Sequence, residues 1–282
     1  MARERRPETR DQRPALWRAP DVRHVLAIAK RELRSYFVSP IAYAALTTFS
    51  LLSGFFFSNM LTSYVRQASL ADGQIERLGR SPLQLDVPTI VLAEFFKNEG
   101  FILLLVLPLL TMGLLTDERR KGTLELLLTS PIRPIELTLG KFTGAMALVT
   151  AMFSLTLPFY YFLAQGGDWE PGIVLAGYVG LLLLAAAEVS IGLFISSLSE
   201  NMLVSALGTY GVLVAFYFVD TSASVTRSIW VDFIQFLSFY FHNAEFARGV
   251  MALRDVTFFA GLIAMGLFLT QRSIEAIRFK RS

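Results

Sequence analysis

The sequence predicts an all-α polytopic membrane protein with six transmembrane helices. Three observations support this fold class. The chain of 282 residues is 54% hydrophobic and 17% charged, whereas soluble domains are roughly 45–50% apolar and about 25% charged. The apolar residues are gathered into long runs that contain almost no charge. Two shorter segments beside these runs have the spacing of amphipathic helices, which is typical of helices at a membrane surface.

A helix needs ~20 mostly apolar residues to cross a bilayer. Six segments qualify. The last of them is short, and its helix is expected to extend into the flanking residues. The expected domains are a disordered tail over residues 1–20, a membrane domain over 21–272 and a basic C-terminus over 273–282. The expected spans lie within 35–65, 95–116, 142–164, 172–198, 202–219 and 256–270.

The distribution of basic residues predicts the topology. An even number of spans places both termini on one side. If that side is the cytoplasm, 19 Lys and Arg residues lie inside and 7 lie outside. Because cytoplasmic loops carry an excess of Lys and Arg, we expect both termini and the loop at 117–141 to be cytoplasmic.

The first amphipathic segment covers residues 21–36, directly before the first expected span. Its apolar residues recur at helical spacing, and its basic residues fall mostly on the remaining surface. This pattern predicts a helix in the inner membrane interface, with either an anchoring or a mechanistic role. The expected apolar face consists of Val22, Val25, Leu26, Ala29, Leu33 and Tyr36.

The second amphipathic segment covers residues 231–250. It is expected to pack at the outer face, with Phe233, Phe236, Leu237 and Tyr240 on one side of a helix.

A short leucine-rich helix from Thr123 to Ser130 is expected in the loop after the second span, where residues 117–131 are DERRKGTLELLLTSP. Leu124, Leu127 and Leu128 share one helical face, and Pro131 prevents the helix from continuing. The leucines could lie on lipid or under the bundle. They could equally enter a groove on a soluble partner. The spacing alone leaves both interpretations open.

Few residues suggest chemistry. The chain has no cysteine and two histidines, and it lacks a phosphate-binding loop because Gly140-Lys141 is followed by Phe142. We therefore expect neither enzymatic activity nor a cofactor or metal bound by this chain. Glu188 lies inside an apolar span, where a carboxylate is costly. It is either a pathway or proton-linked residue, or a carboxyl bonded to a neighbouring helix.

Residues 118–131 also resemble a signature of type-2 ABC exporter permeases, centred on Gly122-Thr123-Leu124-Glu125. Softer matches at 30–33, 39–43, 191–198 and around His242 resemble the gliding-motility-type and copper-maturation-type branch. The resemblance covers roughly residues 24–270.

This resemblance implies an N-terminal amphipathic elbow helix and a short cytoplasmic coupling helix that docks on a separate ATPase. ATP and Mg would bind to that ATPase, present in two copies. A second permease chain would complete a homodimer or heterodimer in the cytoplasmic (inner) membrane of a bacterium. Membrane lipids and an auxiliary subunit with an extracytoplasmic domain are further expected partners, and nucleic acid is not.

The resemblance also implies roles for particular residues. The ATPase-coupling set is Glu118, Arg119, Lys121, Gly122, Thr123, Leu124, Glu125, Leu127 and Leu128. The elbow-helix set is Val25, Arg31, Glu32 and Leu33. Two alternative functions remain: an ion-coupled secondary transporter that uses Glu188, and a non-transporting membrane scaffold of a motility or secretion assembly.

Overall fold

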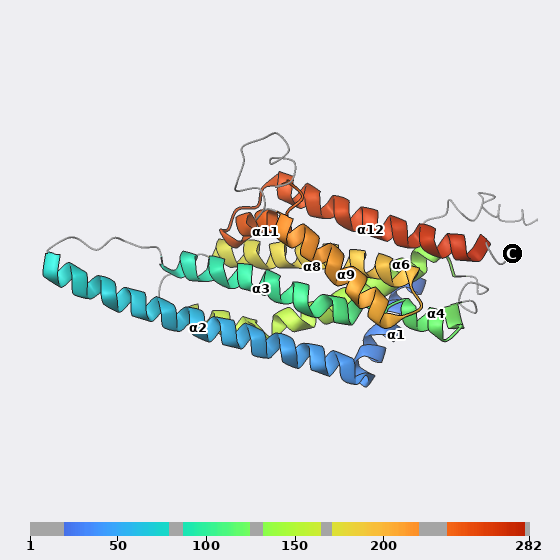
Figure 1. Cartoon of the computed structure of the whole chain (residues 1–282), viewed down its shortest axis with the longest axis horizontal. Helices are drawn as coiled ribbons and strands as arrows, with labels where there is room; N and C mark the ends of the chain where they lie inside the picture. The colour runs from blue at the N-terminus through green and yellow to red at the C-terminus, as the bar shows by residue number, and fades with distance from the viewer. Residues whose placement is uncertain (1–19, 79–86, 125–131, 165–170, 220–235, 280–282) are drawn as a thin grey trace, which may run out of the picture.

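The computed structural model describes residues 20–78, 87–124, 132–164, 171–219 and 236–279, and every regular element in these residues is a helix. The long helices lie side by side and run between two ends of an elongated bundle (Figure 1). Helix α4, the first residues of α1 and the last residues of α12 lie at one end, which we call the α4 end.

The described helices follow one another along the chain. Their bounds are α1 Val22–Val38, α2 Pro40–Leu78, α3 Val87–Thr111, α4 Thr116–Arg120, α6 Pro134–Ser154, α7 Leu157–Ala164, α8 Pro171–Leu198, α9 Met202–Phe218, α11 Phe239–Ala247 and α12 Leu253–Phe279.

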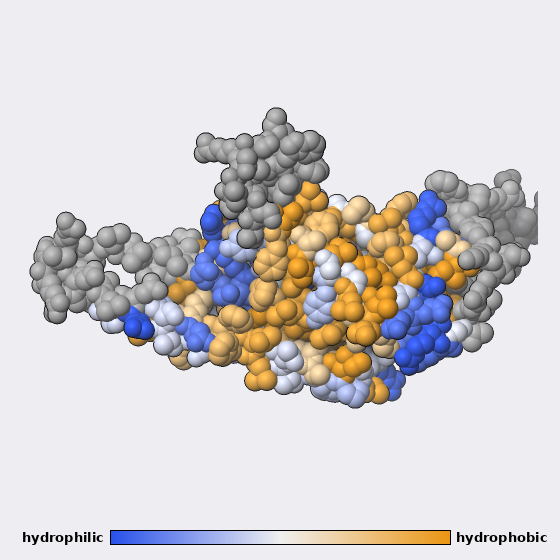
Figure 2. Space-filling view, in the orientation of Figure 1, coloured by the Kyte–Doolittle hydropathy of each residue, from blue (hydrophilic) through white to orange (hydrophobic). Residues whose placement is uncertain are grey.

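Five helical segments of the described residues are long and apolar enough to cross a membrane: Pro40–Arg66, Val91–Arg120, Pro134–Leu163, Pro171–Leu198 and Leu253–Ile277. The segment expected as the fifth of six spans forms α9, an apolar helix of 17 residues that is shorter than these five. The visible surface has a broad hydrophobic middle and hydrophilic residues towards both ends (Figure 2). The protein is therefore a multi-pass membrane protein.

The connection between the first two spans differs from the expectation. The sequence analysis expects the second span to begin near residue 95, but α2 continues to Leu78 and α3 begins at Val87. Charged residues do not stop α3, because they find partners along it. Lys97 Nζ lies 2.7 Å from Glu94 Oε1, and the buried Glu99 accepts a hydrogen bond of 3.0 Å from Ser53 Oγ on α2.

The third expected span is divided into α6 and α7. Pro158 has no backbone N–H, and its ring interferes with the carbonyl of Ser154, four residues earlier. At the break, Thr156 Oγ1 donates to the Phe153 carbonyl at 2.8 Å, and it lies 2.8 Å from the Tyr178 hydroxyl of α8. A bonded break of this kind fits the packing role of a kink rather than an open hinge.

Helix α1 rests on the first half of α6, where two glycines four residues apart remove the side chains that would obstruct it. A Cβ on Gly140 would lie 2.6 Å from Ile28 Cβ, and a Cβ on Gly144 would lie 2.7 Å from Glu32 Cβ. The spacing Gly-x-x-x-Gly permits such close helix approach. The partner of this motif is thus the amphipathic helix of the same chain.

The single apolar face expected on α1 is divided in the structure. Ala29 is buried as expected and Ile28 joins it, whereas Val22 and Leu26 are 66% and 58% exposed. We call the surface of α6 around Gly140 and Gly144 the glycine seat. It packs against the face of α1 that carries small residues and Glu32. Val25, Leu33 and Tyr36 are half-buried, so only part of the expected face is left on the outside of the protein.

At the opposite end, the second amphipathic segment also differs from expectation. Helix α11 begins only at Phe239, because Ser238 caps it by accepting a hydrogen bond from the Phe241 amide at 3.2 Å. Phe236 and Tyr240 are 46% and 41% exposed, and Phe233 lies outside the described residues. The buried face of α11 consists of Phe239, His242, Asn243, Phe246 and Ala247.

A buried histidine joins α11 to α12. His242 Nε2 lies 2.9 Å from the Phe236 carbonyl, and His242 Nδ1 lies 2.6 Å from Asp255 Oδ1. A carbonyl only accepts, so Nε2 carries a hydrogen. The short contact to Asp255 then requires a second proton, either on Nδ1 or on the carboxyl. This pair fixes the loop that leads into the last span.

We predict that Gly140→Val detaches α1 from α6. A branched side chain would overlap Ile28, and such overpacking costs about 1–3 kcal/mol. The measurement is the melting temperature of the purified chain in detergent, together with proteolytic release of the segment that precedes α2. The matched control is Gly261→Ala in α12, where nothing lies within 4 Å of an added Cβ. Equal melting temperatures for Gly140→Val and the parent chain would contradict the close packing of α1 on α6 at Gly140.

Candidate functional site

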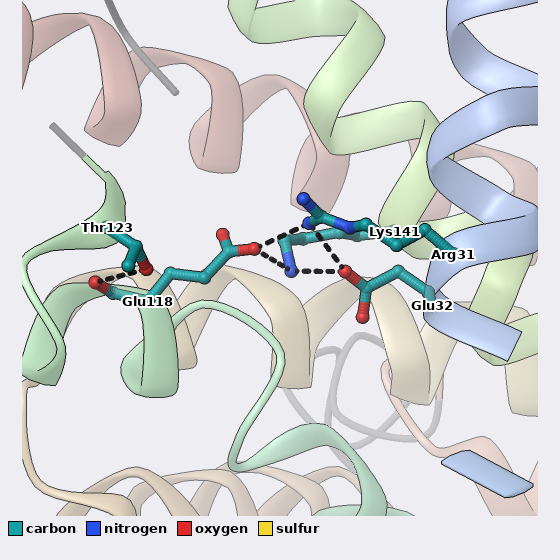
Figure 3. A network of polar contacts seen from close by, with 5 residues as sticks. All are labelled: Arg31, Glu32, Glu118, Thr123 and Lys141. Carbon is teal, nitrogen blue, oxygen red and sulfur yellow. Dashed lines mark hydrogen bonds and ion pairs between the residues drawn. The ribbon is translucent and has the colours of Figure 1, made fainter. Parts of the chain in front are cut away.

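Four charged side chains from three helices meet at the α4 end, and we call them the charged junction: Arg31, Glu32, Glu118 and Lys141. Lys141 Nζ of α6 lies 2.9 Å from Glu32 Oε1 of α1 and 3.0 Å from Glu118 Oε1 of α4. Arg31 Nη2 of α1 lies 2.8 Å from the same Glu118 oxygen and 3.1 Å from Glu32 Oε1. Figure 3 shows the two cations between the two carboxylates.

Burial makes this junction stronger than an ordinary surface pair. The Lys141 side chain is 2% exposed, and the two carboxylate side chains are each 14% exposed. A buried ammonium is tolerated only where it is paired, and removal of one partner leaves the others uncompensated. Partial burial disfavours the charge of Arg31, but the hydrogen bonds and negative charges of Glu32 and Glu118 outweigh it. They hold the pKa of the Arg31 guanidinium above its ordinary value.

A cavity of about 310 Å³ lies between α1 and α4, and all four residues of the charged junction line it. Helix α1 packs against α6 and α2, whereas α4 packs against α8 and α9. The charged side chains therefore bridge two differently anchored elements across open space. Such an arrangement can transmit a displacement of α4 to α1 without a shared packed surface.

Helix α4 is anchored to the last turn of α8. Arg119 Nη1 donates to the Ser197 carbonyl, and Arg119 Nη2 lies 3.5 Å from Glu200 Oε1. Thr116 Oγ1 donates to the Ser196 carbonyl at 3.0 Å. Arg119 was expected on the rim of a partner contact, but its described bonds are made within the chain.

The chain turns sharply after α4. Gly122 has φ +68°, a left-handed conformation that favours glycine. Lys121 and Thr123 are exposed, and Thr123 Oγ1 donates to the Glu118 carbonyl at 3.3 Å. Helical conformation resumes at Thr123. This agrees with the expected start of the leucine-rich helix.

Of the three leucines expected on one face of that helix, the structure describes Leu124. Leu124 is only 3% exposed and belongs to the core, so in this conformation it faces the protein rather than a partner. Glu125, Leu127 and Leu128 lie outside the described residues. Of the coupling set, Glu118 is directed into the charged junction (Figure 3).

The residues of the elbow-helix set fall into two groups. Arg31 and Glu32 belong to the charged junction, while Val25 and Leu33 are half-buried beside the bundle. Lys141 was not among the expected site residues. A lysine one residue after a helix-packing glycine is the signal that could have identified it, since its ammonium must be paired if the glycine face is covered.

Glu136 is a second residue that the sequence analysis missed. It is 2% exposed, and it accepts hydrogen bonds from the Asp21 amide at 3.0 Å and the Arg133 amide at 3.1 Å. His24 Nδ1 lies 3.1 Å from Glu136 Oε2, the oxygen that also accepts from Arg133. One carboxylate thus joins the beginnings of α1 and α6, which places Arg31 and Glu32 opposite Lys141.

Glu188 lies apart from the charged junction. It is fully buried on α8, and neither carboxyl oxygen has a hydrogen-bond partner among the described residues. Ser190, two residues further along α8, donates to the Ala187 carbonyl at 2.8 Å. At a helical rise of 1.5 Å per residue, about 13 Å separates Glu188 from Ser197 along α8.

The described residues contain no group of three or more His, Asp or Glu side chains that could hold a metal ion. They do contain a second buried carboxyl in the spans, Glu99, which is 1% exposed. The sequence analysis placed it within the second expected span, 95–116, but did not single it out as a site residue. Its position four residues after Phe95, on the apolar side of α3, was the available signal.

These features define a class of protein: a multi-pass helical membrane protein whose charged elements at one end are linked to each other. Residues 26–244 match the family described as ABC-2 family transporter protein, and the chain belongs to this family. It is thus a type-2 permease, the membrane transport component of an ABC transporter that works with an ATP-binding subunit. Comparison with curated proteins gave no match.

We predict that Lys141→Met destabilises the α4 end. Without the ammonium, Glu32 and Glu118 retain only the half-exposed Arg31 between them, and removal of one partner from a buried pair costs about 3–5 kcal/mol. The measurement is thermal unfolding in detergent of Lys141→Met, Glu118→Gln and the double variant. The double variant should be more stable than the sum of the single losses predicts.

The control for this cycle is Arg272→Gln in α12. Arg272 is 63% exposed and pairs with Glu275 at 3.1 Å, and exposed pairs contribute about 0–1 kcal/mol. Strictly additive losses for Lys141→Met and Glu118→Gln would show that the two side chains are not coupled.

Proposed function

We propose that this permease is driven by ATP hydrolysis in the partner subunit and exports its substrate across the cytoplasmic membrane of a bacterium. The α4 end faces the cytoplasm in this proposal. Its support is the charge bias, since the segments expected inside carry 19 of the 26 Lys and Arg residues. Helix α9 then completes six spans, because 17 apolar residues are at the lower limit for crossing a bilayer.

The coupling step is proposed to run through the charged junction. The ATPase docks on the loop that follows α4, with Leu127 and Leu128 as apolar contacts and Lys121 and Glu125 at the rim. Movement of the docked loop shifts Glu118, which pulls on Lys141 of α6 and, across it, on Glu32 of α1. The single observation that carries this mechanism is the buried Lys141 ammonium, held by one carboxylate from each side.

The remaining partners follow the family resemblance. Two ATPase copies would bind ATP and Mg, and a second permease chain, identical or related, would complete the pathway. The matches around 30–43, 191–198 and His242 favour the gliding-motility-type and copper-maturation-type branch. An auxiliary subunit with an extracytoplasmic domain would supply any large substrate-binding surface.

We predict that Leu127→Asp abolishes copurification with the ATPase subunit or uncouples ATP hydrolysis from transport. A carboxylate cannot enter an apolar groove without a large desolvation cost. The measurement is affinity copurification from cells that express both subunits, followed by nucleotide-stimulated transport in vesicles.

The matched control for that test is Thr129→Asp, which adds the same charge on another side of the same expected helix. It should retain both copurification and coupling. Normal binding and coupling in Leu127→Asp, or equal loss in both variants, would remove the docking proposal.

A second candidate function, ion-coupled transport through Glu188, is favoured by one observation: a fully buried carboxyl without a partner among the described residues. The variant Glu188→Gln separates the two functions. The amide has the same shape and no charge, so an ATP-driven permease should keep nucleotide-dependent transport near the parent level. Transport that survives removal of nucleotide in the parent chain, and disappears in Glu188→Gln, would replace the ATP-driven proposal.

A further inference from the structure

Helix α1 presents two exposed strips that the bundle does not cover. At 100° per residue, the bundle-facing side is centred between Ile28 and Ala29. Next to it runs an apolar strip, in which Val22, Leu26 and Phe37 are 66%, 58% and 44% exposed. Beyond the apolar strip, the same rotation places a basic strip.

The basic strip consists of Arg23, Lys30 and Arg34, which fall within about 40° of one another around the helix. All three are exposed, and their side chains form no ion pair with any residue that the structure describes. Arg31, which the same rotation places about 60° from Arg34 and about 100° from Lys30, differs because it pairs with Glu32 and Glu118. The basic strip therefore lacks a counter-charge from the described part of the chain.

The apolar strip is continuous with the surface of the first span. Val38, which follows Phe37, is 80% exposed, and Ile41 and Tyr43 at the start of α2 are 47% and 54% exposed. Helix α2 is one of the membrane-crossing helices, so its outward apolar residues contact acyl chains. The apolar strip of α1 lies at the edge of that lipid-covered surface, at the end of the molecule where hydrophilic residues gather (Figure 2).

We propose that α1 binds anionic phospholipid. Val22, Leu26 and Phe37 enter the boundary of the acyl chains, and Arg23, Lys30 and Arg34 contact lipid phosphates. A neutral bilayer would satisfy the apolar strip but would leave three cations without counter-charge. Basic residues near an anionic leaflet contribute about 1 kcal/mol each, which corresponds to roughly fivefold in binding per residue.

The binding has a consequence for the charged junction. Helix α1 is held on α6 by the glycine seat and by Glu136, and a lipid bound to the exposed strips would press α1 towards α6 from the outer side. Anionic lipid would then favour the arrangement in which Glu32 reaches Lys141. The proposal concerns lipid binding by the permease alone, so it does not depend on ATPase docking.

The test uses the purified permease chain in vesicles of phosphatidylcholine that contain a trace of spin-labelled phosphatidylglycerol or spin-labelled phosphatidylcholine. The fraction of each label that the protein immobilises gives its lipid selectivity. The parent chain should select phosphatidylglycerol severalfold, and salt should weaken the selection. The triple variant Arg23→Gln/Lys30→Gln/Arg34→Gln should lose most of it, while Arg23→Lys/Arg34→Lys should retain it.

The matched control is Arg66→Gln/Arg248→Gln/Arg272→Gln, which removes the same charge from exposed positions on α2, α12 and the end of α11. It should keep the selectivity of the parent chain. If both triple variants lost the selectivity, the effect would be one of net charge, and the proposal would be overturned. If both retained it, the basic strip would have no effect on lipid binding, and the proposal would also be overturned.

The position of α1 relative to the lipid is tested separately. The chain has no cysteine, so a single introduced cysteine can carry a label. A fluorophore on Leu26→Cys should be quenched by lipids that carry a nitroxide near the top of the acyl chain. An unquenched label would overturn the proposal. So would a triple variant that keeps its lipid selectivity but loses copurification with the ATPase, because the basic strip would then belong to a protein interface.

Discussion

The arrangement of the α4 end depends on one ammonium group. Lys141 is 2% exposed, and its charge requires two carboxylates from two other helices. This requirement fixes the rotation of α1, because Glu32 must face α6, and the position of α4, because Glu118 must reach across the cavity. A neutral residue at 141 would leave the two carboxylates with the half-exposed Arg31 between them. The electrostatics of one buried group thus determine how three helices meet.

That ammonium can be buried only because α1 approaches α6 closely. The missing side chains of Gly140 and Gly144 bring the backbone of α1 within contact distance, and Glu136 fixes the beginning of the same helix through the Asp21 amide. The close approach covers Lys141 and simultaneously turns Leu26 and the basic strip outwards. Packing on one side of α1 therefore decides which residues its other side offers to the membrane.

Two sets of charged groups in this protein contrast with each other. Those of the charged junction lie at a polar end, partner one another and line a cavity that leaves them room to move. Glu99 and Glu188 lie inside the apolar bundle, where Glu99 accepts a hydrogen bond from Ser53 and Glu188 has no partner among the described residues. A paired network at a polar end suits the transmission of force between helices. An isolated buried carboxyl such as Glu188 has no partner among the described residues through which it could transmit such a movement.

The sequence by itself determined the fold class, most of the helices and the family, because long apolar runs, helical spacing and a local signature around Gly122 are properties of neighbouring residues. It also predicted α1 and the resumption of helix at Thr123. Only the tertiary structure decided that Glu118 turns inwards, that Leu124 is buried and that Lys141 joins α1 to α4. The physical reason is that these contacts join residues about 20 to 110 positions apart in the chain. A charge pattern shows which groups need partners, but it does not show which helices will be close enough to supply them.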